Sequence, residues 1–146
     1  MRPLKNFEEF VREGIIKKQS PNIDRANSLM KESEKSNKFL NDIVEKIGVS
    51  NDNANNIIKN TYDIIMELIR ARMFREGYNS SGYGAHEAEV SFLRKVGISE
   101  NEVQLINQLR YFRNGIMYYG KSFDKDYAEK VLSLLKEIKE RLARPS

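Results

Sequence analysis

The residues of this chain that could do chemistry gather in one stretch, residues 104–122, which reads QLINQLRYFRNGIMYYGKS. Arg110 and Arg113 lie there on one stripe of a predicted helix, together with Ile106 and Met117. A guanidinium at the edge of a buried face needs a carboxylate, a phosphate or a partner chain close by. The neighbouring stripe is apolar, and its spacing of three and four residues predicts that it faces a core: Leu105, Leu109, Phe112, Ile116 and Tyr119.

The run RNGIMYYG at residues 113–120 resembles the signature of HEPN domains. In that signature an arginine is followed by a polar residue, often Asn, and then, four to six residues further on, by a histidine. Arg113 and Asn114 match this pattern. The histidine positions hold Tyr118, Tyr119 and a glycine instead, so the histidine of the signature is missing.

The HEPN resemblance implies roles for these residues. In HEPN ribonucleases the arginine holds the scissile phosphate and the histidine moves the proton, often in a site completed across a dimer interface. Arg113 and Asn114 are therefore our catalytic candidates, with Tyr118 and Tyr119 as replacements for the histidine. A tyrosine has a pKa of about 10, so few tyrosines are ionised at neutral pH to act as a base. We expect ribonuclease activity that is weakened or lost.

Each candidate also has a structural interpretation. Arg113 could tie two helices together through a carboxylate such as Asp63 or Glu67, with Asn114 bonded to backbone. The two tyrosines could be half-buried interface aromatics, or could stack on a base. His86, the only histidine, could act as a general acid or base if the preceding turn folds over Arg113. It could equally cap or pack its own helix.

Composition excludes several classes of site. The chain has no cysteine and one histidine, which excludes a disulfide framework and zinc sites built on cysteine or several histidines. Glu87 and Glu89 fit ordinary helix surface better than a metal site, so we expect no metal and no cofactor. The net charge of +4 comes from 25 basic and 21 acidic residues interleaved along the chain, a weak argument for nucleic acid. Among the basic residues, we assign Arg110 and Lys121 to binding.

Apolar periodicity predicts an all-α bundle of about five or six helices, in one domain over residues 1–146. An N-terminal helix or arm over 1–20 packs on a bundle over 22–143. The HEPN resemblance extends loosely over this same bundle and implies the same fold. The segment 77–84, GYNSSGYG, is predicted to be a turn between helices, because no GK[ST] or strand context accompanies it. The expected helices cover about 4–17, 22–47, 51–77, 85–95, 100–119 and 126–142.

Capping residues mark several helix ends. Ser20 suits an N-cap with Pro21 at the first helical position. Ser99 and Glu102 form a capping box, and Asp124 suits the N-cap of the last helix. The segment 51–77 is the most apolar helix, so we place it at the centre of the bundle.

These observations predict a HEPN-like, RNA- or nucleotide-associated binding domain. No apolar run is long enough to span a bilayer and the charged N-terminal residues do not form a leader, so we expect a cytoplasmic protein. Excess apolar surface around Met117, Tyr118 and Tyr119 favours a homodimer. Two alternatives remain open. One is an active, metal-independent, toxin-like endoribonuclease; the other is a protein that only pairs with a small nucleotidyltransferase, as in two-component toxin–antitoxin systems.

Overall fold

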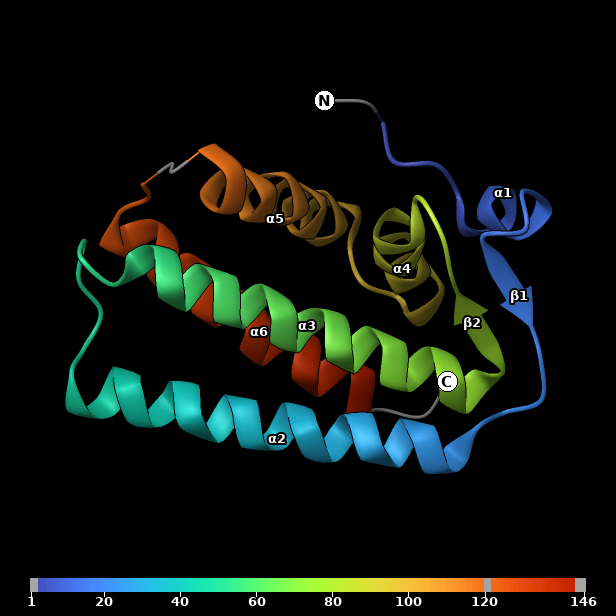
Figure 1. Cartoon of the computed structure of the whole chain (residues 1–146), viewed down its shortest axis with the longest axis horizontal. Helices are drawn as coiled ribbons and strands as arrows, with labels where there is room; N and C mark the ends of the chain where they lie inside the picture. Colours follow the sequence, from blue (N-terminus) through green and yellow to red (C-terminus); the bar gives the residue numbers. More distant parts are fainter. Residues whose placement is uncertain (1–2, 120–121, 144–146) are drawn as a thin grey trace.

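The computed structural model describes residues 3–119 and 122–143, which contain six α-helices and one pair of short strands (Figure 1). The predicted all-α bundle of five or six helices is confirmed. No helix within these residues is both long and apolar enough to cross a membrane. In chain order the elements are α1 (Phe7–Arg12), β1 (Ile16–Lys18), α2 (Ile23–Lys46), α3 (Ala54–Glu76), β2 (Tyr78–Ser80), α4 (Ala85–Phe92), the 3₁₀ helix η1 (Leu93–Val96), α5 (Glu100–Tyr119) and α6 (Lys125–Ala143).

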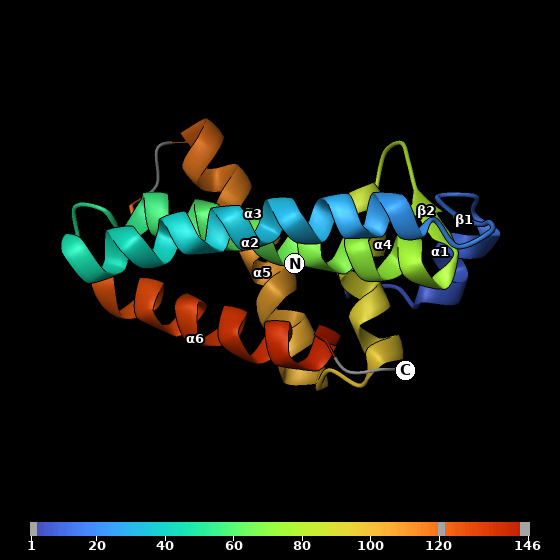
Figure 2. The ribbon, with the colours of Figure 1, turned by 90° about the horizontal axis from the view of Figure 1, so that it is seen from below.

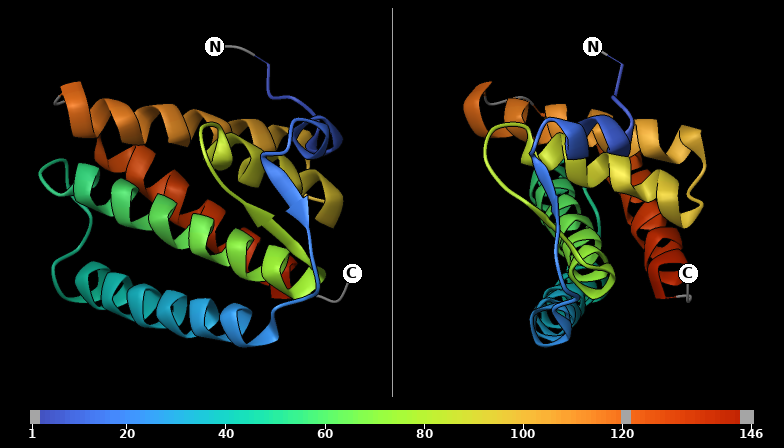
Figure 3. Two further views of the ribbon diagram at one scale, coloured as in Figure 1. Left: turned by 45° about the vertical axis from the view of Figure 1, so that its right-hand side comes forward. Right: turned by 90° about the vertical axis from the view of Figure 1, so that its right-hand side faces the viewer.

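Helix α3 lies at the centre of the bundle, as its apolar sequence predicts. Its buried side chains face several directions, including Ile57, Ile65, Leu68 and Met73. Helix α2 packs along one side of α3, and α6 also runs beside it, while α4 and α5 lie on the side opposite α2 (Figures 1 and 3). Seen from below, α5 crosses α3 steeply (Figure 2). The polar residues of α3, α4 and α5 are thereby brought to one region.

The buried face of α5 is rotated relative to the predicted stripe. Leu109 is fully buried as expected, but Ile106 and Val103 are buried too, whereas Leu105 and Phe112 are only partly covered. The reason is that α5 packs against α4 as well as α3, which shifts its contact face towards Ile106. The side chains of the two remaining members of the stripe, Ile116 and Tyr119, lie outside the described part of the structure.

The two strands were not predicted. We expected the first helix to reach about residue 17 and the segment 77–84 to be a plain turn, and the structure has a short strand in each place. Ile16 to Lys18 pairs antiparallel with Tyr78 to Ser80, with Ile16 opposite Ser80. Helix α1 ends early because Gly14 adopts a positive φ of 79°, and Ile16 then enters the core. Strands of three residues are too short to show an alternating pattern in sequence. A Cβ at Gly77 would lie 2.5 Å from the carbonyl oxygen of Gln19, so glycine is needed where β2 begins.

The predicted capping residues are confirmed at two helix starts and corrected at one. Ser99 and Glu102 form the expected capping box, with the Glu102 amide 3.2 Å from the Ser99 hydroxyl. Asp124 accepts a hydrogen bond from the backbone of α6 at 2.8 Å. Helix α2, however, is capped by Asn22 rather than Ser20. Residues 19–22 remain extended, because their backbone amides at 19 and 22 bond to the end of α3. The expected helix over 85–95 ends at 92 and continues as η1.

Candidate functional site

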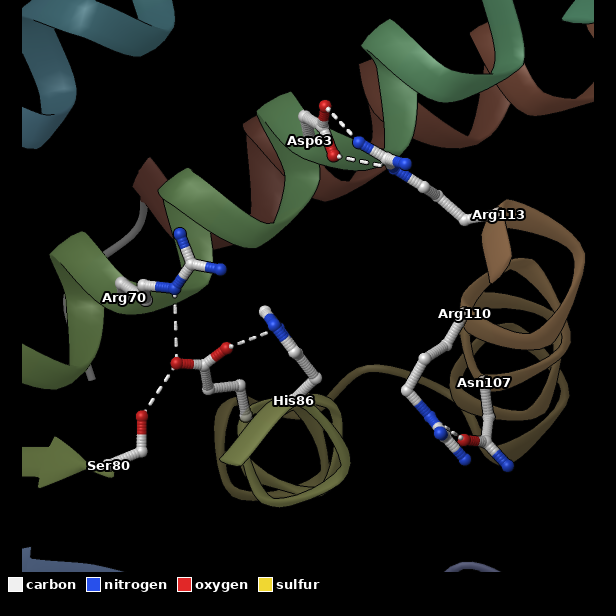
Figure 4. A network of polar contacts seen from close by, with 8 residues as sticks. Asp63, Arg70, Ser80, His86, Asn107, Arg110 and Arg113 are labelled. Carbon is white, nitrogen blue, oxygen red and sulfur yellow. Dashed lines mark hydrogen bonds and ion pairs between the residues drawn. The ribbon is translucent and has the colours of Figure 1, made fainter. Parts of the chain in front are cut away.

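Three helices place charged and polar side chains in one region, which we call the polar cluster (Figure 4). Asp63 and Arg70 lie seven residues apart on α3, which puts them two turns apart on the same face. Helix α4 contributes His86 and Glu89. Helix α5 contributes Asn107, Arg110 and Arg113, which follow one another at intervals of three residues. The full cluster consists of Tyr62, Asp63, Arg70, Ser80, His86, Glu87, Glu89, Asn107, Arg110 and Arg113.

Arg113 holds α5 to α3 through Asp63. Its Nε and one terminal nitrogen each lie 3.2 Å from a different oxygen of the Asp63 carboxylate. The guanidinium is 24% exposed and the carboxylate 48% exposed. Asp63 is one of the two carboxylates through which we expected Arg113 to tie two helices together. The contact is bidentate, as guanidinium contacts with carboxylates and phosphates often are.

Arg110 is more enclosed than Arg113. Its Nε donates to the Asn107 side-chain oxygen at 3.2 Å, and a terminal nitrogen lies 3.6 Å from a carboxylate oxygen of Glu87. The guanidinium also lies over the ring of Tyr111, 4.4 Å from the ring centre. Asn107 itself is buried. Arg110 therefore does lie at the edge of a buried face, as predicted, but polar groups of the chain already surround it.

Glu89 is the buried carboxylate of the polar cluster, and the prediction that it is ordinary surface is wrong. Its side chain is only 4% exposed. One oxygen accepts hydrogen bonds from Arg70 at 3.1 Å and from the Ser80 hydroxyl at 2.6 Å. The other oxygen lies 3.3 Å from Nδ1 of His86 without forming a well-aligned hydrogen bond. Burial raises the pKa of Glu89, but the His86 contact and the charge of Arg70 outweigh burial and lower it.

Tyr62 lies among these charges, on the inner side of α3. Burial raises the pKa of its hydroxyl well above the usual range, and the charges of Arg110, Glu89, Arg70 and Asp63 also act on it. Charges on all three helices therefore lie close enough to Tyr62 to act on its hydroxyl. A hydroxyl with a raised pKa stays protonated at neutral pH and can serve only as a hydrogen-bonding group.

The other predicted site residues are not drawn into this cluster. Asn114 is exposed and makes no hydrogen bond within the described part of the chain. His86 points from α4 towards α3 and pairs with Glu89 rather than joining Arg113 (Figure 4). The side chains of Tyr118 and Tyr119, and all of Lys121, lie outside the described residues. The geometry around Arg113 is therefore defined by Asp63 alone among the groups that the structure describes.

The exposure of each arginine's carboxylate partner determines how easily an anion could replace that carboxylate. Arg70 faces Glu89, Arg110 faces Glu87, and Arg113 faces Asp63, so an incoming anion has to displace a carboxylate. Asp63 is the most exposed of the three carboxylates and can be rehydrated when it is displaced. Displacing Glu89 would leave a charge buried without a partner, which costs far more. Arg113 is thus the arginine of the cluster whose carboxylate partner is displaced at the lowest cost.

Several members of the cluster were not anticipated from sequence: Tyr62, Arg70, Ser80 and Asn107. Arg70 offered a signal, since it is a charged residue in the most apolar helix, two turns from Asp63. Among the described residues, no three His, Asp or Glu side chains come close enough together to hold a metal ion. No protein-family model matches the chain, and neither a curated protein nor a solved structure matches it. The HEPN assignment thus rests on the motif alone and stays a prediction.

Proposed function

We propose that this chain is a HEPN-like domain that binds RNA or a nucleotide through Arg113, with ribonuclease activity weakened or lost. The observation that carries the proposal is the pairing of Arg113 with a half-exposed carboxylate. Two oxygens of Asp63 meet two nitrogens of the guanidinium, each at 3.2 Å. A phosphate offers a similar pair of oxygens and satisfies the same fork.

The energetics favour exchange of one anion for the other. An ion pair at this level of exposure contributes about 0–1 kcal/mol to stability, so little is lost when the carboxylate returns to water. A backbone phosphodiester carries one negative charge, as a carboxylate does, but its binding also releases the counterions condensed on the nucleic acid. Asp63 thus keeps the guanidinium in place in the free protein, and phosphate competes with it directly.

Weak catalysis follows from what surrounds Arg113. The signature histidine is absent, and the only histidine of the chain is engaged by Glu89. A tyrosine in its place has an ordinary pKa of about 10 and rarely acts as a base at neutral pH. Arg113 would then position a phosphate without an efficient proton acceptor beside it, and an RNA-cleavage assay on the purified protein distinguishes this domain from an active endoribonuclease.

The direct test changes each partner of the ion pair and measures affinity for single-stranded RNA at two salt concentrations. Arg113→Ala should lower affinity about tenfold and flatten the salt dependence by about one phosphate contact. Asp63→Asn should raise affinity, because it removes the competing negative charge and keeps the shape of the side chain. Arg75→Ala is the matched control, since Arg75 is an arginine on α3 that donates to Asn27 and not to Asp63.

The outcomes separate a specific site from general attraction to a basic surface. If Arg75→Ala weakens binding as much as Arg113→Ala does, the affinity comes from net charge and the assignment of Arg113 is wrong. If Asp63→Asn and Arg113→Ala lower affinity equally, the ion pair supports the fold rather than the ligand, and the proposal also fails.

A further inference from the structure

A groove runs between α2 and α3, and Asp63, the ion-pair partner of Arg113, is one of the residues that line it. Its volume is about 370 Å³. We call it the α2–α3 groove. Ile64 forms an apolar, fully buried part of its floor. Helix α2 lies alongside α3 over the length of this segment (Figures 1 and 3). The groove is lined by Lys35, Ser36, Phe39, Asn60, Asp63, Ile64 and Glu67.

Phe39 presents an open aromatic ring to this groove. The residue is 64% exposed, whereas its neighbour Leu40 is fully buried against the bundle. No aromatic or cation contact covers the ring among the residues that the structure describes. A single exposed apolar residue is common on protein surfaces. An exposed ring in a groove, beside a guanidinium that can take a phosphate, has the composition of a site for an unpaired nucleotide.

The polar groups of the groove are available as well. Asn60 is exposed and Glu67 is partly exposed, and neither side chain makes a hydrogen bond with the described residues. Burial raises the pKa of the Glu67 carboxyl, Arg70 lowers it, and the charges of Glu32 and Asp63 raise it further. The groove therefore offers amide and carboxyl groups next to the ring, which match the hydrogen-bonding edge of a base.

Charge decides how a nucleotide would lie in the groove. Asp63 and Glu67 repel a phosphate from the middle of the groove, but their oxygens accept hydrogen bonds from the amino groups of adenine, cytosine or guanine. The phosphate is favoured only where it replaces Asp63 on Arg113, a residue that pairs with Asp63 and does not itself line the groove. Base and phosphate are thus assigned to opposite parts of one continuous surface.

The geometry points to a binding site for one unpaired nucleotide of a single strand, with the base stacked on Phe39, its edge facing Asn60 and Glu67, and its phosphate on Arg113. This inference rests on the proposed function for the phosphate and adds the base contact to it. It commits the site to single strands, because a base paired in a duplex cannot stack on the ring.

The test measures affinity for labelled oligonucleotides of about 12 nucleotides, a length within the range of known single-strand sites. Phe39→Ala and Phe39→Leu should both lower affinity about fivefold to a hundredfold, the effect of losing one stacked base. Phe39→Tyr keeps the ring and should bind like the wild type. Ile47→Ala is the matched control, since Ile47 is an apolar residue just after α2 that is 75% exposed and lies outside the groove.

Further arms of the experiment define the ligand. Adenine and cytosine strands should bind more tightly than uracil strands, because uracil has no amino group to donate to the carboxylates. Glu67→Gln should narrow that difference. The same sequences as RNA and DNA show whether the ribose contributes, and a matching duplex should bind more weakly than the single strand.

Each contrary result removes a defined part of the inference. If Arg113→Ala weakens binding while Phe39→Ala does not, the phosphate site stands and the stacking site is wrong. If Phe39→Leu binds like the wild type, the contact is apolar and not stacking. If Phe39→Ala instead changes the sedimentation of the free protein, the ring belongs to an interface between copies. If no strand binds at all, both this inference and the proposed function fail.

Discussion

Two arginine–carboxylate contacts join α3 to its neighbours, and they differ in how deeply they are buried. Arg70 meets Glu89, whose side chain is almost fully covered and also bonds Ser80. Arg113 meets Asp63, which is half exposed and whose carboxylate has that guanidinium as its only hydrogen-bond partner among the described residues. The chemistry of the two contacts is the same. Burial makes the first a structural element of the fold and leaves the second open to exchange with a ligand.

The largest expected effect comes from breaking the buried contact. Glu89→Ala should destabilise the protein by about 1–3 kcal/mol, because it leaves Ser80 and the Arg70 guanidinium without their shared acceptor. Urea denaturation of the variant and the wild type measures the difference. Glu87→Ala provides a comparison on the same helix, because Glu87 lies two residues earlier on α4 and pairs with Arg110. An unchanged midpoint for Glu89→Ala would mean that burial does not distinguish the two contacts.

A pH titration sharpens the same contrast. The pKa of Glu89 is lower in the folded protein than the ordinary value of 4.5, so its ionised form stabilises the fold. This contribution is fully present above that ordinary value and is lost as the pH falls through the folded pKa. The wild type should therefore lose more stability on acidification than Glu89→Gln does. Melting temperatures at a series of pH values check this, and parallel curves for the two proteins would contradict it.

The smallest effect is expected for the exposed contact. Arg113→Ala should cost less than about 1 kcal/mol, since Asp63 is rehydrated when its partner is removed. A double-mutant cycle with Asp63→Ala isolates the pair, and a coupling energy as large as that expected for the buried contact would remove the basis for ligand exchange.

Helix positions were predictable because their determinants are local. The capping box at Ser99 and the N-cap at Asp124 are defined by residues within one turn, and the structure confirms both. The strands at Ile16 and Tyr78 depend on pairing between distant segments, which no local pattern records. The shifted cap of α2 has the same origin, since backbone bonds to α3 keep residues 19–22 extended.

The candidate site was predictable only in part. A guanidinium at the edge of a buried face needs an anionic partner. This requirement predicted that Arg113 is paired and named Asp63 as one of its possible partners. Glu89 was missed because its burial depends on where α4 packs. Its neighbours Ala88 and Val90 do not indicate from sequence that the Glu89 side chain is buried. Phe39 shows the opposite case, an apolar residue that stays exposed. Its spacing fits the apolar face of α2, but only Leu40 reaches the bundle fully.

The strand pair has a mechanical consequence for α2. At one end the helix is joined to α3 by the turn around Asn53, whose side chain bonds back to Gly48. At the other end β1 pairs with β2, and the amides of Gln19 and Asn22 bond to the last turn of α3. Helix α2 is therefore held to α3 at both of its ends and resists moving away from it. A ligand entering between the two helices meets walls of fixed spacing, so little conformational entropy remains to be lost on association.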